Sequence, residues 1–318
     1  MSKTDKRLDE AARAGWLYYV AGNTQDEIAV KLGVSRQSAQ RLVAHAMSAG
    51  LVKVRIDHPL ANCLDLASKM RKQFGLKFCE VAPTDSTATS TTLGVSDVAA
   101  GEIERWLRFD EPKTLAIGTG RTLKAAIDRL PQIDCPQHVI VSLTGNISPD
   151  GAAAYFNVVF NIANLVTARC FPMPLPVITT SARERSMLHA QKMIRSTLDR
   201  AARADVAFVG VGDLSDNPPL LVDGFISHEE LVAMQTAGAV GEIVGWAYDC
   251  EGCLIDGQTN SRVTSAPLPA VDSAMVIAVA KGRIKLPAIR AAIKGRLING
   301  LITDEQTADS LLSLQNTR

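Results

Sequence analysis

The segment LAIGTGRTLKAA, residues 115–126, contains the residue types and spacing that bind an anion or a hydroxylated ligand. An apolar strand is predicted to end at Gly118, and a helix is predicted to begin near Thr122. Gly118 and Gly120 allow a tight turn that brings the backbone close to a ligand. The backbone N–H groups of this turn would point into one space, where the helix dipole favours negative charge. The predicted cradle consists of Gly118, Thr119, Gly120, Arg121 and Thr122.

This loop matches neither of two common nucleotide-binding motifs. It lacks the third glycine of the dinucleotide-binding fingerprint and the Gly-Lys-Thr of a Walker A loop, so a strand-to-helix turn without a ligand is the alternative. Two further predicted strands end in glycine-bearing loops, LTGNIS at 143–148 and VGVGDLS at 209–215. Loops at the carboxyl ends of parallel strands line one crevice, so the three loops together favour a ligand site.

The three loops lie in a region where predicted strands and helices alternate. Helices are predicted over Leu60–Phe74, Gly94–Leu107, Tyr155–Ala168 and Ser186–Ala201, and strands over residues 77–83, 113–118, 138–145 and 174–179, with a strand and turn over 205–214. The strands are rich in Val and Ile, as expected for strands that are buried on both faces. This alternation predicts a Rossmann-like, mostly parallel α/β sheet.

A smaller unit is predicted over residues 1–57, followed by the α/β region over 58–318, because Pro59 interrupts any helix between them. The segment NTQDEIAVKLGVSRQSAQRLV, residues 23–43, predicts two short helices around a turn. Thr24 and Glu27 have capping-box spacing, and Gly33 permits the left-handed conformation that ends a helix. Ser35 can cap the next helix. This pattern predicts a helix-turn-helix.

The polar residues near the start of the second helix of this motif indicate DNA binding. Such side chains can donate hydrogen bonds to guanine or adenine edges in the major groove. Residues 1–58 contain nine Lys or Arg and six Asp or Glu, a net charge of +3, whereas the whole chain carries +1. A basic unit on a near-neutral body suits a phosphate backbone, although a bundle that docks a protein is the alternative. The predicted DNA-binding residues are Ser35, Arg36, Gln37, Gln40 and Arg41.

Two details complete the predicted DNA-binding unit. Trp16, Leu17 and Val20 are predicted to form the apolar face of a first helix over Leu8–Ala21. The segment GLVKVRID, residues 50–57, predicts a short strand that would make the unit winged-helix-like. Because one such unit grips little DNA, a dimer or higher oligomer is expected.

The composition is that of a globular protein, with 318 residues of which 47% are hydrophobic. No run of about 18 apolar residues predicts a transmembrane helix, and six scattered cysteines suggest reduced thiols and a cytoplasmic location. Cys250 and Cys253 have CxxC spacing, but a zinc site needs two further ligands. A turn at Glu251-Gly252 is therefore favoured, and we expect no metal or cofactor.

Across nearly its whole length, the chain resembles the SorC family of sugar-responsive bacterial transcription regulators. The matching pieces, in order, are TQDEIAVKLGVSRQSAQRLV, IGTGRTL, ADVAFVGVGDL, GAVGEIVGWAYDCEG and VIAVAKGRIKLPAIRAAIKGRLINGLITDEQTA. The resemblance implies a helix-turn-helix joined to an effector domain that is similar to the folds of ribose-phosphate and glucosamine-phosphate isomerases. It also implies a homo-oligomer, typically a tetramer, that responds to sugars, polyols or their phosphates.

The resemblance also implies a set of effector-binding residues. Asn146 stands where the family more often has a second Gly, and Glu242 stands where it usually has Asp. Turn capping is the alternative role for Glu242 and Asp249, and a solvated helix-end position is the alternative for Lys285. Lysine and arginine at this site suit either a charged or a hydroxylated ligand. The implied set is Gly118, Thr119, Gly120, Arg121, Thr122, Gly145, Asn146, Glu242, Asp249 and Lys285.

Two functions fit these features. The first is a regulator that binds double-stranded operator DNA, responds to a sugar, polyol or sugar phosphate, and controls a carbohydrate or polyol catabolic operon. The second is a phosphosugar isomerase-like enzyme, because the same fold carries that chemistry. The isomerase stretches DGADE and KGGGG are absent, and Asp213 is the nearest acid, with no partner evident in the sequence. We therefore predict the regulator and no enzymatic activity.

Overall fold

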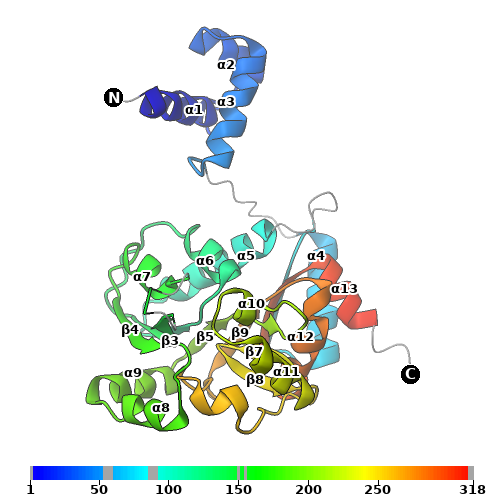
Figure 1. Cartoon of the computed structure of the whole chain (residues 1–318). Helices are drawn as coiled ribbons and strands as arrows, with labels where there is room; N and C mark the ends of the chain where they lie inside the picture. The colour runs from blue at the N-terminus through cyan, green and yellow to red at the C-terminus, as the bar shows by residue number, and fades with distance from the viewer. Residues whose placement is uncertain (1–2, 53–59, 85–91, 149–150, 154–155, 314–318) are drawn as a thin grey trace. The chain divides into compact units, whose positions relative to one another are not determined.

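The computed structural model describes residues 3–52, 60–84, 92–148, 151–153 and 156–313 (Figure 1). The chain divides into two compact units, Met1–His58 and Pro59–Arg318. Each unit has its own hydrophobic core, so each is described by itself.

The first unit contains three helices, α1 (Lys3–Tyr19), α2 (Gln25–Leu32) and α3 (Arg36–Ser48). The capping box before α2 is confirmed, because the Thr24 side chain accepts the N–H of Glu27 and the Glu27 carboxylate accepts the N–H of Thr24 at 2.7 Å. Gly33 has φ +64°, in the left-handed region that favours glycine. Ser35 caps α3 by accepting the N–H of Ser38. The predicted turn between two short helices is therefore present.

The apolar face predicted for the first helix is partly wrong. Leu17 is buried, but the residues Trp16 and Val20 are 56% and 70% exposed. The face that packs is instead made of small residues, since a Cβ atom on Gly15 would lie 2.9 Å from the Cβ of Ala46 on α3. This close helix approach leaves no room for bulky side chains. The predicted wing falls largely outside the described residues, and the part within them, residues 50–52, is not a strand.

The second unit is built on a seven-stranded sheet of order β1-β10-β9-β5-β2-β3-β4. Every neighbouring pair in this sheet is parallel, which confirms the predicted parallel α/β fold. The strands are β1 (Phe78–Ala82), β2 (Thr114–Ile117), β3 (Val139–Ile147), β4 (Arg169–Pro176), β5 (Val206–Val209), β9 (Met275–Val279) and β10 (Gly300–Asp304).

Helices cover both faces of this sheet. One core contains Ala116 of β2 and residues of α4, α9, α12 and α13. The other contains Leu115 of β2 and residues of α5, α6 and α7, because successive side chains of a strand point to opposite faces. Helices α4 and α13, from distant parts of the sequence, lie side by side (Figure 1). The helices of this unit are α4 (Ala61–Phe74), α5 (Leu93–Leu107), α6 (Arg121–Ile127), α7 (Val158–Ala163), α8 (Ala182–His189), α9 (Lys192–Ala202), α10 (Pro219–Val222), α11 (His228–Thr236), α12 (Leu286–Lys294) and α13 (Glu305–Ser313), with 3-10 turns at Gln258–Arg262 and Arg283–Lys285.

A small antiparallel sheet stands beside the large one. It consists of β6 (Gly212–Asp213), β7 (Ala239–Ile243) and β8 (Trp246–Asp249), in the order β6-β7-β8. It contributes Ala239 and Ala247 to a third core with residues of α10 and α11, and Ile243 and Tyr248 to a core of the large sheet. It brings residues of β7 next to loops that follow the parallel strands.

Three predicted elements differ from the structure. The helix predicted over Ser186–Ala201 is two helices, α8 and α9, separated at Gln191, whose backbone is extended. The helix predicted over Tyr155–Ala168 contains only α7, because Val166 leaves it to bridge with Ile133. The strand predicted over 174–179 is β4, which begins earlier, at Arg169. Prolines at alternate positions of β4 are tolerated because β4 is an edge strand.

The CxxC segment forms a turn, as the favoured interpretation predicted. Cys250 and Cys253 are exposed free thiols, and Asp249 accepts the N–H groups of Glu251 and Cys253, each at 2.9 Å. Within the described ranges, no group of three or more His, Cys, Asp or Glu side chains is placed to hold a metal ion.

We expect Gly252→Ala to destabilise the second unit by about 2–5 kcal/mol. Gly252 has φ +80°, and an added Cβ would lie 2.4 Å from the carbonyl oxygen of Ala291 and 2.6 Å from the Cα of Gly295. Gly257→Ala is the matched control, because Gly257 has φ +67° but open space around the added atom. Thermal unfolding should show a clearly larger loss for Gly252→Ala. If both variants lost the same amount of stability, backbone strain alone would account for the loss, and the close packing around Gly252 would not contribute.

Candidate functional site

A cavity of about 460 Å³ opens at the carboxyl ends of strands β2, β3, β5 and β9. The three glycine-bearing loops all contribute to its wall, through residues 119–122, Gly145 and residues 210–212. Glu242 on β7 and Lys285 before α12 add charged groups to the wall. The topology of the parallel sheet therefore brings these segments together, as expected for loops at one edge of a sheet.

The first loop faces the cavity through its glycine and threonine residues. Gly120 has φ +124°, and nothing lies within 4 Å of the position of a Cβ atom there. Thr122 lines the cavity. The hydroxyl of Thr119 donates to the carbonyl oxygen of Phe156 at 2.6 Å, so this group holds the loop in place. Gly118 does not line the cavity, and its N–H donates to the carbonyl oxygen of Phe208 at 2.8 Å.

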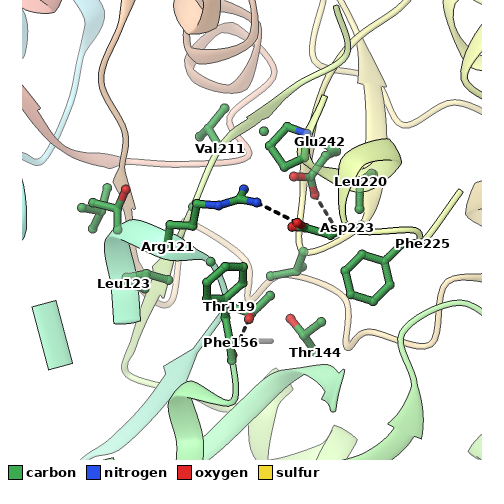
Figure 2. Close-up of a pocket in the computed structure, with 18 of the residues that line it drawn as sticks. Thr119, Arg121, Leu123, Thr144, Phe156, Val211, Leu220, Asp223, Phe225 and Glu242 are labelled. Carbon is green, nitrogen blue, oxygen red and sulfur yellow. Dashed lines mark hydrogen bonds and ion pairs between the residues drawn. The ribbon is translucent and has the colours of Figure 1, made fainter. Parts of the chain in front are cut away.

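Arg121 reaches toward Asp223, as Figure 2 shows. Its guanidinium nitrogen lies 2.6 Å from a carboxylate oxygen of Asp223, and its guanidinium carbon lies 5.1 Å from the centre of the Phe156 ring. Asp223 follows the short helix α10, which also brings Leu220 to the wall, and Phe225 lies just beyond. The sequence indicated neither Asp223 nor these apolar residues, because the segment has no periodic pattern.

Glu242 and Lys285 are two further charged residues of the cavity wall. The Glu242 carboxylate accepts the N–H of Gly245 at 2.7 Å, and the Lys285 ammonium donates to the carbonyl oxygen of Val211 at 2.7 Å. Burial raises the pKa of Glu242, although the hydrogen bond from Gly245 and the attraction of Lys285 partly oppose this. Burial lowers the pKa of Lys285, against the attraction of Glu242 and Asp213. The two side chains thus influence each other across a site that is shielded from water.

Lys281 is a further cation of the wall that the sequence did not single out. It pairs with Asp304 at 3.0 Å. Burial alone would raise the pKa of Asp304, but hydrogen bonds from Thr307 and Lys281 outweigh it and hold that pKa below its ordinary value. The next residue, Glu305, accepts the side-chain amide of Asn62 at 2.6 Å and the N–H of Thr84 at 3.0 Å. Acidic residues at the end of β10 therefore contact both the cavity wall and the start of α4.

Three of the implied effector-binding residues, Gly118, Asn146 and Asp249, do not line the cavity. Asp249 lies in the CxxC turn and caps it, which is the alternative role that its sequence position allowed. Asn146 continues β3 beyond Gly145, and its side-chain oxygen is buried with no hydrogen-bond partner among the described residues. For Asn146 the reason lies in the pairing of β3 with β4, which shifts register between Gly145 and Ile147 and so interrupts the alternation of side chains along β3.

The predicted DNA-binding residues lie together at the start of α3. Ser35 caps the helix, and Arg36, Gln37, Gln40 and Arg41 are exposed on its first turns. Arg36 makes an exposed ion pair with Asp26 at 3.4 Å; such pairs are weak, so this guanidinium remains available. Amide and guanidinium groups can read base edges in pairs of hydrogen bonds.

In the parts of the chain that the structure describes, no helix is long and apolar enough to cross a membrane.

Two short helices around a turn, followed by a parallel α/β unit with a cavity that charged and apolar side chains line, are the architecture of a transcription regulator with a ligand-binding domain. The family described as "Putative sugar-binding domain" matches residues 58–313. The chain is 33% identical over 316 residues to the erythritol catabolism regulatory protein EryD of Brucella abortus, covering 99% of each chain. It is 31% identical over 321 residues to the transcriptional regulator LsrR of Enterobacter sp. strain 638, covering 99% of this chain and 95% of LsrR.

The fold is also that of a solved regulator. The full-length sorbitol operon regulator SorC from Klebsiella pneumoniae superimposes with a TM-score of 0.70 at 24% identity, covering 96% of this chain and 99% of SorC. The chain belongs to the SorC family of sugar-binding transcriptional regulators. The predicted family and the prediction of a regulator rather than an isomerase agree with these relatives, which are named as regulators.

The raised pKa of Glu242 predicts a pH-dependent effect of Glu242→Gln on stability. The unfolded chain ionises this group around its ordinary pKa of 4.5, whereas the folded protein resists ionisation. Wild-type stability therefore falls as the pH rises from 4.5 through the raised pKa, and the loss persists above it. Glutamine cannot ionise and avoids this loss. The thermal unfolding midpoint of Glu242→Gln, measured relative to that of wild type, should therefore be higher at about pH 7.5 than at about pH 4.

Glu184→Gln provides a control of opposite sign. The side-chain and backbone hydrogen bonds from Thr180 hold the pKa of Glu184 below its ordinary value. Its ionised form is therefore favoured in the folded state, and the variant should lose stability relative to wild type as the pH rises. A midpoint difference for Glu242→Gln that is equal at both pH values would contradict the assigned environment of Glu242.

Proposed function

We propose that this protein binds operator DNA through residues 1–57 and a carbohydrate or polyol effector through residues 58–318, and thereby controls a catabolic operon. One observation carries the proposal: a cavity with both hydrogen-bond donors and acceptors lies where the three glycine-bearing loops converge, in a chain that also presents α3. The names of two similar proteins support a polyol effector, because one is a regulator of erythritol catabolism and the other a regulator of a sorbitol operon. A regulator of chromosomal DNA would act in the cytoplasm.

The proposed effector site consists of groups that suit a ligand rich in hydroxyls. Backbone N–H groups at Gly120 and Thr122, with the ammonium group of Lys285, can donate, while the carboxylate of Glu242 can accept. Binding alters DNA affinity only if the effector prefers one arrangement of the protein over another. A coupling free energy of about 1–3 kcal/mol would change operator affinity by about 5–150-fold.

The proposal includes a homo-oligomer, most simply a tetramer, that brings several copies of α3 to a repeated DNA site. A single helix-turn-helix contacts too little DNA for tight and specific binding. Light scattering at micromolar concentration, with and without operator, should show more than one copy per particle. A monomer under both conditions would exclude this arrangement.

The function can be tested on duplexes of random sequence. The purified full-length protein would select bound duplexes from a random double-stranded library, and the enriched site would be used for binding titrations. Sugars, polyols and their phosphate esters would then be added at saturating concentration. The proposal expects at least one probe to shift operator affinity about fivefold or more, and the same probe to raise the thermal unfolding midpoint. Failure to enrich any sequence would contradict the DNA-binding function.

A further inference from the structure

The cationic side chains that line the cavity already have acidic partners in the structure. Arg121 lies 2.6 Å from Asp223, whose side chain is 13% exposed, so the acid is held largely away from water. Lys281 lies 3.0 Å from Asp304, and both side chains are mostly buried. In each pair, the positive charge that could attract an anionic ligand is offset by a fixed negative charge at contact distance.

Lys285 has a similar environment. Its ammonium group donates to the carbonyl oxygen of Val211 at 2.7 Å, and the acids that attract it are Glu242, on the wall, and Asp213. Asp213 is 7% exposed and belongs to β6, which pairs with β7 at Glu242. Two acids of the small sheet therefore balance the third cation of the cavity.

The charge balance of the described residues at this site disfavours a phosphate ester. The three cations Arg121, Lys281 and Lys285 face the four acids Asp213, Asp223, Glu242 and Asp304. Even with Glu242 protonated, cations and acids are equal in number. A phosphate group would add about two negative charges to a cavity that holds no surplus of positive charge. Such a charge is costly where water is partly excluded.

An uncharged polyol avoids this cost and uses the same groups. Each hydroxyl both donates and accepts, so carboxylate oxygens of Asp223 and Glu242 can receive hydroxyl protons while nearby cations donate to hydroxyl oxygens. Apolar atoms of Leu220 and Phe225 can pack against the carbon chain. Resting on the proposed function, we propose that the effector is a polyol or sugar that carries no phosphate, with Asp223 as a specificity-determining residue.

The first test measures binding of matched neutral and phosphorylated probes to the full-length protein by calorimetry. The neutral probes are erythritol, xylitol and sorbitol, and the charged probes are erythritol 4-phosphate, sorbitol 6-phosphate and inorganic phosphate. We expect at least one neutral polyol to bind, and its phosphate ester to bind about tenfold or more weakly. Tighter binding of an ester than of its parent polyol would overturn the inference.

The second test removes the acid that pairs with Arg121. Asp223→Asn keeps the size of the side chain but leaves the guanidinium without its charged partner, so the ratio of ester to polyol affinity should rise about tenfold or more. Asp216→Asn is the matched control, because Asp216 is an exposed acid of the same segment that does not line the cavity. An unchanged ratio in Asp223→Asn would overturn the role assigned to Asp223.

The two proposals fail in different ways. If an ester binds the cavity more tightly and shifts operator affinity, the neutral-effector inference is wrong while the proposed function stands. If all six probes leave both the calorimetric signal and the operator affinity unchanged, the neutral-effector inference is overturned, and the broader screen of sugars, polyols and phosphate esters decides the proposed function.

Discussion

Joint replacement of Arg36, Gln37, Gln40 and Arg41 by alanine is expected to abolish sequence-specific operator binding. These side chains are exposed on the first turns of α3 and lie at the end of the helix that enters the major groove in helix-turn-helix proteins. Loss of one bidentate base contact costs about 1–3 kcal/mol, so loss of two should weaken binding by at least about thirtyfold. Titration of the selected operator against a scrambled duplex would measure both affinity and specificity.

The control must separate base reading from simple loss of charge. The double variant Arg7→Ala with Arg13→Ala also removes two positive charges, but from exposed positions on α1. This double variant should retain the preference for operator over scrambled DNA, whereas the α3 variant should lose it. Circular dichroism should show that both variants keep their helices. An α3 variant that still protects the operator with wild-type affinity would exclude this surface as the reading surface.

Gly120→Val is expected to make the regulator insensitive to its effector while leaving DNA binding intact. The Cβ atom at this position would have open space around it, and the cavity wall includes Gly120, so the added side chain would occupy volume that the ligand needs. The φ of +124° adds backbone strain for any residue other than glycine. We expect the effector concentration for half-maximal response to rise by at least about a hundredfold, equivalent to about 2.7 kcal/mol.

Two companion variants define what this result means. Gly257→Val introduces a similar strain at φ +67° in open space, and Gly257 is not part of the cavity wall, so its effector response should remain normal. Thr122→Ala removes one hydroxyl donor and should shift the dose curve by about tenfold or less. A wild-type dose curve for Gly120→Val would show that the effector binds elsewhere and that the loop is only a turn.

Local sequence signals predicted the parts of the fold that local forces determine. The capping box at Thr24, the left-handed Gly33 and the cap at Ser35 involve residues at most four positions apart, so the helix-turn-helix could be deduced from spacing alone. The parallel sheet followed from runs of Val and Ile between helices. Edge strand β4 was misplaced because its prolines obscure the strand pattern, and only the finished sheet shows that it lies at an edge.

The cavity was harder to predict because its pairs join distant segments. Arg121 and Asp223 are 102 positions apart, and the segment before Asp223 contains only the four-residue helix α10. No periodic pattern can indicate such a contact. Asp249 shows the opposite difficulty: an acid beside a glycine turn fits both a ligand-binding and a capping role, and the hydrogen bonds to Glu251 and Cys253 show the second.

The consecutive acids Asp304 and Glu305 couple the cavity wall to the beginning of helix α4. Asp304 holds Lys281 of the cavity wall, and Glu305 holds Asn62 in the first turn of α4. Helix α4 is the first element of the second unit. A ligand that draws Lys281 toward itself would therefore pull on Asp304 and, through the peptide bond to Glu305, on the first turn of α4.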